Sequence, residues 1–290
     1  MGRRNVVGAG LGEVSPQPTV RMNNQNAQPY MSGPFPKNDK TVTLIGLTQW
    51  LDVQLYQAQI SSMARLDLKL LPVTPFAQNC SLLYDVDTLE GVLIDPGGEA
   101  KRLKETLDKL GIKLKEMWLT HGHLDHAGGA DELRETLGVS VIGPHKDDQF
   151  WMDGITDQWS KYGHPGMGRT VIPDRYLEDG DVLELSDVKF NVLHTPGHTP
   201  GHVIIYNKDM KIAFVGDVLF RGSIGRTDFP KGNHQQLLDS ITGKLWPLGD
   251  DMRFVPGHGQ MGTFGGERKD NAFVADHVIG RTAPNSSGPG

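Results

Sequence analysis

The stretch Thr120-His121-Gly122-His123-Leu124-Asp125-His126 brings three imidazoles and one carboxylate together in a short segment. The apolar run at 117–119 is typical of the end of a buried strand, and residues 128–137 have a helical pattern. The histidines therefore belong to a turn between a strand and a helix, where the backbone can direct several side chains toward one point. The stretch has the outline of a metal site.

Two neighbouring binding points are compatible with this loop. His121 and His123 are two positions apart and project to the same side of an extended segment. Asp125 and His126 follow the bend and would aim at an adjacent point. Imidazole and carboxylate suit zinc, manganese or iron(II), and no thiolate lies nearby to form a closed structural zinc site. The alternative is a solvated polar loop that binds nothing.

Length, charge and cysteine content limit the classes of protein that fit. The 290 residues allow one large domain or two small ones. A net charge of −6 without a basic run argues against nucleic acid as a partner. Cys80 is the only cysteine, so no internal disulfide can form, and a cytoplasmic enzyme is expected. No apolar stretch approaches the roughly 18 to 20 residues that a membrane span needs, so no membrane partner is expected.

The beginning of the chain differs in composition from the rest. It is rich in glycine, proline and asparagine and has few aliphatic clusters, so it cannot bury enough surface to offset its ordering entropy. We expect an N-terminal extension over residues 1–62 that is mostly disordered, and one catalytic domain over residues 63–290. The extension lacks both a secretory hydrophobic core and a convincing amphipathic arginine pattern.

Strand and helix patterns alternate through the catalytic domain. Strands are expected at 68–73, 80–84, 91–95, 114–119, 139–142, 182–185, 188–193, 211–215 and 252–255 and in a segment ending at 206, and helices at 100–110, 128–137 and 235–246. Gly111 is expected to cap the helix at 100–110. Residues 143–180 are less regular, and we expect them to cross the surface beside the histidine loop.

Further histidines and aspartates stand at the ends of predicted strands. They occur in a second loop at 194–202 that holds three histidines, in Gly216-Asp217, and in Pro256-Gly257-His258-Gly259. Active sites are commonly assembled from loops that a rigid scaffold positions. Spacing alone does not choose among the three histidines of the second loop.

The order and spacing of these segments resemble the metallo-β-lactamase superfamily. The pattern runs His-x-His-x-Asp-His, then Thr-Pro-Gly-His-Thr, Gly-Asp and Pro-Gly-His, within residues 66–275. The resemblance implies an α/β fold, a four-layer αββα sandwich of two similar halves with metals at one edge of the sheets. Residues 72–80, 222–229 and 256–259 look like a short bacterial branch of glyoxalase II, the hydroxyacylglutathione hydrolases.

Carried over position by position, the resemblance implies two metal ions and seven ligands. The first ion would be held by His121, His123 and His198, the second by Asp125, His126 and His258, and Asp217 would bridge the two. The family pattern thus selects His198 over His194 and His202, which are expected to pack or to form hydrogen bonds. It gives Asp95 a role in the scaffold.

Such a ligand set implies hydrolysis by a hydroxide bound between the two ions. Two divalent ions, with zinc favoured over iron or manganese, would lower the pKa of a shared water toward neutrality. The hydroxide would attack the carbonyl of a thioester such as S-lactoylglutathione, while the second ion stabilises the oxyanion and the leaving thiolate. Asp125 could also orient the hydroxide, so it is the one side chain assigned a catalytic role.

Arg226 is the expected contact to the small-molecule thioester. It falls where longer glyoxalase II enzymes carry a basic residue that holds the glutathione carboxylate, and arginine can bind a carboxylate in bidentate fashion. The alternative for Arg226 is a surface salt bridge. The chain after His258 is too short for the helical C-terminal domain of the longer relatives. Either fewer residues contact the glutathione portion of the substrate here, or residues 143–180 supply those contacts.

Other functions compete with this one. An iron(II) persulfide dioxygenase of the same superfamily resembles the chain at 225–229, and would use His121, His198 and Asp217 on a single iron. The segment 256–259 argues against it, because it completes a second site in the manner of the hydrolases. A nuclease of the same fold is disfavoured by the acidic balance. A non-catalytic metal-binding protein is disfavoured because every ligand position is filled.

Overall fold

The computed structural model describes residues 20–21 and 64–280. The extension predicted over residues 1–62 lies outside the described residues, apart from the two-residue strand β1 (Val20–Arg21), which pairs antiparallel with the next strand. A domain that starts at residue 63 stays a prediction.

The first of two large sheets has the strand order β1-β2-β3-β4-β5-β6. Its other strands are β2 (Leu66–Val73), β3 (Gln78–Asp85), β4 (Glu90–Ile94), β5 (Lys113–Trp118) and β6 (Ser140–Ile142). Strands β1 to β4 are antiparallel neighbours, whereas β4, β5 and β6 run parallel. Parallel strands require long crossover connections, which here contain helices. Because β4 and β5 run in one direction, the loops that follow them lie at the same edge.

The second sheet has the order β14-β13-β10-β9-β8-β7. Its strands are β7 (Val182–Leu185), β8 (Val188–His194), β9 (Val203–Asn207), β10 (Ile212–Gly216), β13 (Arg253–Pro256) and β14 (Gly262–Thr263). Strands β10 and β13 are parallel, and the other neighbours are antiparallel. A separate ribbon joins β11 (Leu219–Phe220) to β12 (Ser223–Ile224).

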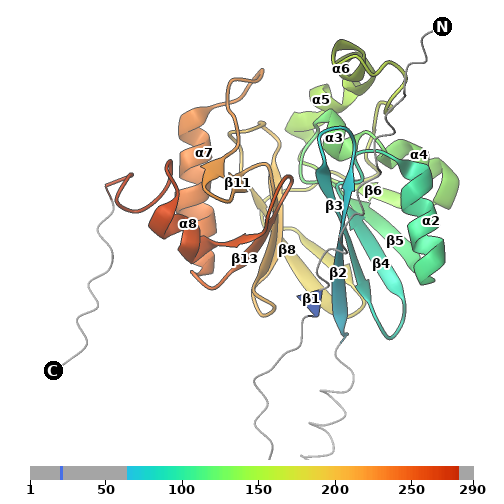
Figure 1. Cartoon of the computed structure of the whole chain (residues 1–290), viewed down its shortest axis with the longest axis horizontal. Helices are drawn as coiled ribbons and strands as arrows, with labels where there is room; N and C mark the ends of the chain where they lie inside the picture. Colours follow the sequence, from blue (N-terminus) through green and yellow to red (C-terminus); the bar gives the residue numbers. More distant parts are fainter. Residues whose placement is uncertain (1–19, 22–63, 281–290) are drawn as a thin grey trace, which may run out of the picture.

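Helices cover the outer face of each sheet, so the expected four-layer αββα arrangement is confirmed. Figure 1 shows α2 and α4 outside the first sheet and α7 and α8 outside the second. The helices are α2 (Ala100–Leu110), α3 (Leu124–Ala127), α4 (Ala130–Leu137), α5 (Gln149–Asp153), α6 (Ile155–Lys161), α7 (His234–Ser240) and α8 (Phe264–Asp270), with short helical turns η1 (Lys146–Asp148), η2 (Ile241–Leu245) and η3 (Trp246–Leu248).

Three apolar layers hold the sandwich together. Successive side chains of a strand point to opposite faces, so Leu82 of β3 packs in the outer helical layer while Leu83 packs between the sheets. Trp118 also fills the layer between the sheets, and Phe254 packs under the helices of the second sheet. All four side chains are fully buried. The core thus fixes the two sheets relative to each other, and with them the loops at the shared edge.

Residues 143–180 differ most from the prediction of a surface excursion. They form η1, α5 and α6, and Met152, Ile155 and Trp159 are completely buried in the outer layer of the first sheet. These positions follow helical spacing, but Gly154 separates two short helices within them. Because this pattern is interrupted, helical periodicity did not predict either helix.

Element boundaries differ from the predictions in smaller ways. The helix expected at 128–137 is α4, which begins two residues later at Ala130, and the end of the histidine loop forms a separate short helix, α3, that was not predicted. In place of the helix expected at 235–246, the α-helix α7 ends at Ser240. The chain then continues as the π-helical turn η2 and the 3₁₀ turn η3. Gly111 does cap α2, with a left-handed φ of 70° that glycine adopts without strain.

Candidate metal centre

The loops that carry histidine and aspartate meet at one edge of the sandwich. His121 and His123 follow β5 of the first sheet. His198 lies between β8 and β9, Asp217 follows β10 and His258 follows β13, all in the second sheet. Both halves of the chain therefore contribute to one place, and the structure brings all seven predicted ligands together there.

The first cluster consists of His121, His123 and His198, whose ring nitrogens converge. Nδ1 of His123 lies 3.0 Å from Nε2 of His121 and 3.0 Å from Nε2 of His198. At most 6% of each residue is exposed. Bulk water therefore does not provide hydrogen-bond partners for these nitrogens.

The partners of the other ring nitrogens fix the tautomers in this cluster. The Thr120 hydroxyl donates its hydrogen to the buried carboxylate of Asp95 at 2.6 Å. It therefore accepts from Nδ1–H of His121 at 3.1 Å. Nδ1–H of His198 donates to the carbonyl of Arg226 at 2.8 Å. Nε2 of both rings therefore presents a lone pair to His123, whose Nδ1 carries at most one proton. A cation between the three nitrogens satisfies all of them, so the donor set fits a metal ion.

The second cluster consists of Asp125, His126 and His258. Nε2 of His258 lies 3.2 Å from Oδ2 of Asp125. Nδ1–H of His258 donates to the carbonyl of Phe76 at 3.1 Å, and Nδ1–H of His126 donates to Asp95 at 2.9 Å. Nε2 of each ring is therefore the nitrogen that faces a carboxylate of the centre. The side chain of His258 is 28% exposed, so this cluster is open to solvent.

Asp217 lies between the two clusters. Its Oδ1 is 3.4 Å from Nε2 of His126, and its Oδ2 is 3.6 Å from Nε2 of His198 and 3.7 Å from Nε2 of His258. Nε2 of His126 and Oδ1 of Asp217 are buried and have no hydrogen-bond partner among the described residues. Buried polar atoms of this kind are costly unless something pairs with them. A pair of cations beside Asp217 would do so.

The two clusters differ in charge. Burial lowers the pKa of His121 and His123 well below the ordinary value, and the neighbouring imidazoles lower it further, so the first cluster is neutral. Burial also opposes protonation of His126, but the carboxylates of Asp217 and Asp125 outweigh it and raise the pKa of His126. Despite burial, the pKa of Asp217 is held well below its usual range, chiefly by His126. The carboxylates beside the second cluster therefore attract positive charge.

Glycines next to the ligands allow the loops to approach one another. A Cβ on Gly257 would lie 2.1 Å from Oδ1 of Asp217 and 2.5 Å from Cε1 of His126. Gly216 has a φ of +47°, and a Cβ there would lie 2.5 Å from Oγ1 of Thr120. The Gly-Asp and Pro-Gly-His motifs therefore have a steric reason as well as a chemical one.

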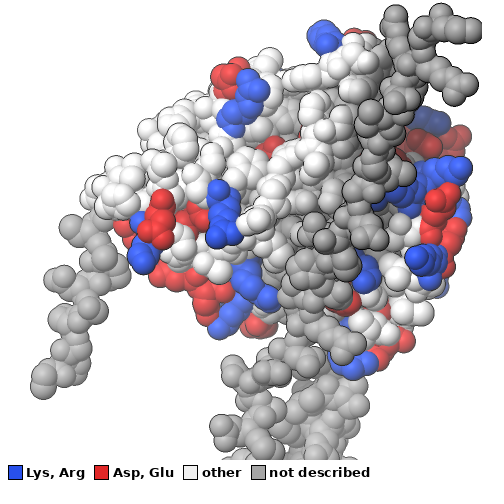
Figure 2. Space-filling model, viewed as in Figure 1, with Lys and Arg blue, Asp and Glu red and all other residues white. Residues whose placement is uncertain are grey.

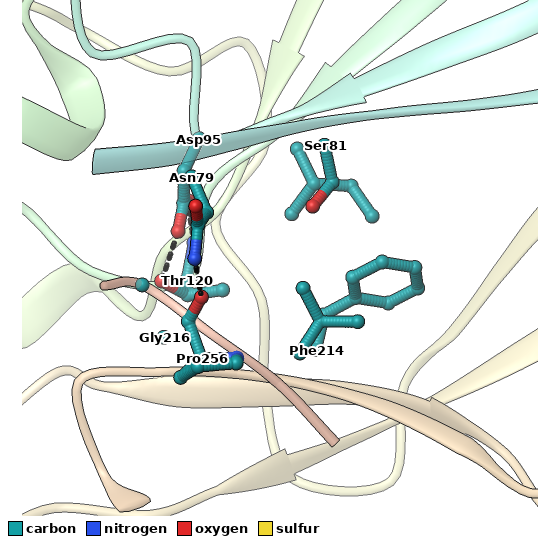
Figure 3. Close-up of a pocket in the computed structure, with 10 residues that line it drawn as sticks. Asn79, Ser81, Asp95, Thr120, Phe214, Gly216 and Pro256 are labelled. Atoms are coloured by element: carbon teal, nitrogen blue, oxygen red, sulfur yellow. Dashed lines mark hydrogen bonds between the residues drawn. The ribbon is translucent and has the colours of Figure 1, made fainter. Parts of the chain in front are cut away.

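Asp95 connects both clusters from behind. Its Oδ1 accepts from the Thr120 N–H at 2.7 Å, and its Oδ2 accepts from the Thr120 hydroxyl at 2.6 Å and from His126 at 2.9 Å. Asp95 thus orients one imidazole directly and that of His121 through Thr120. Figure 3 shows Asp95 and Thr120 joined at the wall of a small cavity between the sheets, with Ser81 and Phe214 on its other side.

His194 and His202 stand outside both clusters, and each forms a hydrogen bond as predicted. Nε2–H of His194 donates to the carbonyl of Pro200 at 2.8 Å. Nε2 of His202 accepts from the N–H of Asp217 at 3.1 Å, and its ring stacks on His121 at 4.6 Å. His202 therefore supports two of the proposed ligands without contributing to the convergent nitrogens.

Arg226 lies at the rim of the first cluster. Its guanidinium carbon is 4.2 Å from the ring centroid of Phe229, and that ring meets His123 edge-on at 4.9 Å. Nε and Nη2 of Arg226 each donate to the Asp228 carboxylate at 2.7 Å. The side chain of Arg226 is 59% exposed. Arg226, the predicted substrate contact, therefore forms the surface salt bridge that was considered as its alternative role.

Asn79 has a supporting role that its place in the sequence did not reveal. Its Nδ2 donates to the carbonyls of Pro256 at 3.1 Å and Gly259 at 2.9 Å, and its backbone N–H donates to the carbonyl of Gly257 at 2.7 Å. These bonds surround His258 on both sides. The residue lies within the stretch 72–80 that resembles glyoxalase II, but no spacing rule links it to a loop so distant in the sequence.

Basic and acidic side chains are interspersed on the described surface (Figure 2). On the face shown in Figure 2, the basic side chains of the described residues lie beside acidic ones and form no continuous basic area. Ion pairs such as Arg134 with Asp131 and Arg169 with Glu135 account for several of the cations. No helix in the described part of the chain has both the length and the apolar character that crossing a membrane requires.

Comparisons with known proteins point to one family. A family model described as the metallo-beta-lactamase superfamily matches residues 73–258. A relative from Haemophilus influenzae, named hydroxyacylglutathione hydrolase GloC, is 44% identical over 210 residues, which cover 72% of this chain and 98% of the relative.

Two solved structures have the same fold. The BLEG-1 B3 metallo-beta-lactamase superposes with a TM-score of 0.66 and is 36% identical, over 71% of this chain and 99% of its own. The protein TTHA1623, in a di-iron-bound form, has a TM-score of 0.64 and is 34% identical, over 71% of this chain and 100% of its own.

Proposed function

Because this chain belongs to the metallo-beta-lactamase superfamily, we propose that it is a metal-dependent thioester hydrolase of glyoxalase II type, acting on S-lactoylglutathione or a related hydroxyacyl thioester. The relative from Haemophilus influenzae that is named a hydroxyacylglutathione hydrolase supports this substrate class. The observation that carries the proposal is the position of Asp217, whose two carboxylate oxygens face His198 of the first cluster and His126 of the second.

The residues divide into ligands and substrate contacts. The first ion would be held by His121, His123 and His198, the second by Asp125, His126 and His258, with Asp217 shared. Bound divalent cations would polarise the thioester carbonyl and lower the pKa of a shared water. Zinc is favoured by the imidazole-rich donor set, while a di-iron neighbour keeps iron in consideration.

Two side chains would contact the attacking water or the substrate. Asp125 keeps a carboxylate oxygen 3.2 Å from Nε2 of His258 at the open cluster, where it can accept a hydrogen bond from the attacking water. Arg226 stands at the rim, where it would bind a carboxylate of the thiol portion. A cytoplasmic location stays a prediction from the single cysteine.

The second cluster supports this function over that of the iron dioxygenase. A mononuclear site needs only His121, His198 and Asp217. It would give no role to the close approach of His258 and Asp125 in a cluster that is open to solvent. The two-ion hydrolase uses every convergent ligand, so we favour it.

Release of free thiol from S-lactoylglutathione by the purified full chain tests the proposal. We expect hydrolysis that is lost on chelation, restored by zinc, and abolished in His121→Ala and Asp217→Asn. His234→Ala is the control, because that histidine is exposed and belongs to neither cluster. Full activity in the two ligand variants would refute the proposal. One bound iron together with oxygen uptake on glutathione persulfide would establish the dioxygenase. A β-lactam is assayed beside the thioester as a comparison substrate.

A further inference from the structure

A buried carboxylate outside both clusters binds the loops of the first one. Asp148 ends η1, between β6 and β7, and none of its surface is exposed. Its Oδ2 accepts from the N–H of Gly122 at 2.9 Å and from the hydroxyl of Thr199 at 2.7 Å. Its Oδ1 accepts from the N–H of Gly201 at 2.6 Å. Hydrogen bonds to an ionised acceptor are roughly twice as strong as neutral ones.

The three donors belong to the two histidine loops. Gly122 lies between the ligands His121 and His123, after β5 of the first sheet. Thr199 and Gly201 follow the ligand His198, in the loop between β8 and β9 of the second sheet. Asp148 therefore bonds directly to both of the loops whose imidazoles must meet, although they come from opposite halves of the chain.

The turn that carries Asp148 is wedged between these loops. A Cβ on Gly122 would lie 2.7 Å from the carbonyl oxygen of Asp148, and a Cβ on Gly201 would lie 2.5 Å from its nitrogen. Trp151, one helical turn later, meets the ring of His123 edge-on with centroids 4.6 Å apart. Neither loop can shift toward the other without moving this turn, because protein interiors are close-packed.

We propose that Asp148 is a positioning residue for the first metal ion. It holds the two histidine loops at the separation at which the nitrogens of His121, His123 and His198 converge. The inference rests on the proposed function, since it requires that this cluster binds a metal ion. Residues 143–180 then contribute to the centre through this carboxylate.

The substitution Asp148→Asn tests the proposal at nearly constant volume. Asparagine offers one acceptor oxygen where the carboxylate offers two, so its amide NH₂ must face at least one of the three donors. We expect the affinity of the first cluster for zinc to fall about 10- to 100-fold, as is usual when a partner of a ligand loop is lost. Zinc titration against a chromophoric chelator measures this without any thioester substrate. The titration is repeated in the His258→Ala background, where the second cluster lacks one proposed ligand and the first keeps its three histidines.

Asp67→Asn is the matched control. Asp67 is also buried, and it accepts from the Tyr84 hydroxyl at 2.8 Å and from the N–H of Leu68 at 3.0 Å, far from the histidine loops. It should lower the free energy of unfolding without changing zinc affinity. If Asp148→Asn loses stability but binds the first zinc as tightly as Asp67→Asn does, Asp148 is only a structural residue and the proposal is overturned.

A second pair of variants decides the matter if Asp148→Asn does not fold. Thr199→Val removes one donor at constant shape, whereas Thr199→Ser keeps the hydroxyl. We expect weaker first-ion binding in the valine variant and wild-type binding in the serine variant. Equal binding in both would contradict the proposal. A wild-type protein that binds no zinc would instead refute the proposed metal function, which is a distinct result.

Discussion

The guanidinium of Arg226 and the carboxylate of Asp228 form a bidentate ion pair, with Nε to Oδ1 and Nη2 to Oδ2 both at 2.7 Å. The hydrogen bond from Arg226 lowers the pKa of Asp228 to about 2. Asp228 is therefore ionised at neutral pH. A substrate carboxylate that binds Arg226 has to compete with this internal one.

The substitution Asp228→Asn should remove the competitor. We expect the KM for S-lactoylglutathione to fall several-fold with kcat unchanged, because the freed guanidinium binds the ground state and the transition state equally. Arg226→Ala should raise KM. A lactoyl thioester of an uncharged thiol is the control substrate, and its KM should not respond to either change. A rise of KM in Asp228→Asn would mean that the pair orients Arg226 and does not compete for it.

Gly257 should not tolerate a side chain. In Gly257→Ala the new methyl group would overlap Oδ1 of Asp217 at 2.1 Å and Cε1 of His126 at 2.5 Å, so a proposed ligand must move. We expect the affinity for the second metal ion to fall about 10- to 100-fold, measured by metal content after dialysis and by chelator competition.

Gly243→Ala is the control for this substitution. A Cβ on Gly243 meets nothing within 4 Å, and the residue lies in a helical turn, where alanine is preferred over glycine by about 1 kcal/mol. Its metal content should equal that of the wild type. A Gly257→Ala protein that keeps both ions would show that Asp217 is free to move, and would weaken the assignment of Asp217 as a shared ligand.

The convergence of the ligands followed from local patterns. His121 and His123 could be placed together because they share one short segment, and Asp217 could be added because it follows an apolar strand. Strand ends in such folds gather at a common edge, so residues distant in sequence become neighbours without any direct sequence signal between them. The resemblance to a known family then selected His198 among three histidines of one loop.

The supporting contacts were not predictable in the same way. Asp148 bonds to Gly122 and Gly201, which lie 26 and 53 positions away. Nothing in the pair Asp147-Asp148 shows which carboxylate turns inward. Asn79 bonds across 177 and 180 positions to the carbonyls beside His258. Such bonds depend on the docking of whole sheets, which hydrophobic periodicity does not specify.

Asp179, which belongs to neither histidine cluster, should make the stability of the protein depend on pH. Its Oδ1 accepts from the N–H of His194 at 2.7 Å and from Nζ of Lys244 at 2.9 Å. Partial burial opposes ionisation, but these donors outweigh it, so the pKa of Asp179 lies below its ordinary value. A lowered folded-state pKa means that the stabilisation is present above the unfolded pKa and is lost as the pH falls through the folded one.

The substitution Asp179→Asn measures this contribution. The carboxylate is 52% exposed and screened by solvent, so we expect a loss of only about 0.5 kcal/mol in the free energy of unfolding at pH 7. Urea unfolding of both proteins from pH 7 to pH 3 should show the difference shrinking below about pH 4. A difference that is constant with pH would exclude ionisation of Asp179 as its cause.

Asn79 should support the second cluster in the way that Asp148 supports the first. The two hydrogens of its amide hold the carbonyls of Pro256 and Gly259, which flank His258. In Asn79→Asp, an ionised carboxylate would place oxygen against both carbonyl oxygens, so the loop must move away. Asn207→Asp is the control, because Asn207 also donates to a backbone carbonyl, at 2.8 Å, but far from the ligands.

Two-step zinc titration distinguishes the two supports. We expect Asn79→Asp to weaken binding of the second ion about 10- to 100-fold and to leave the first unchanged, the reverse of the pattern expected for Asp148→Asn. The physical reason is that Asp148 bonds directly beside ligands of the first cluster and Asn79 beside a ligand of the second, while Asp217 is the side chain that faces both. If either variant weakened both ions equally, the loops would move as one unit. Local hydrogen bonds would then not set the affinities of the two ions separately.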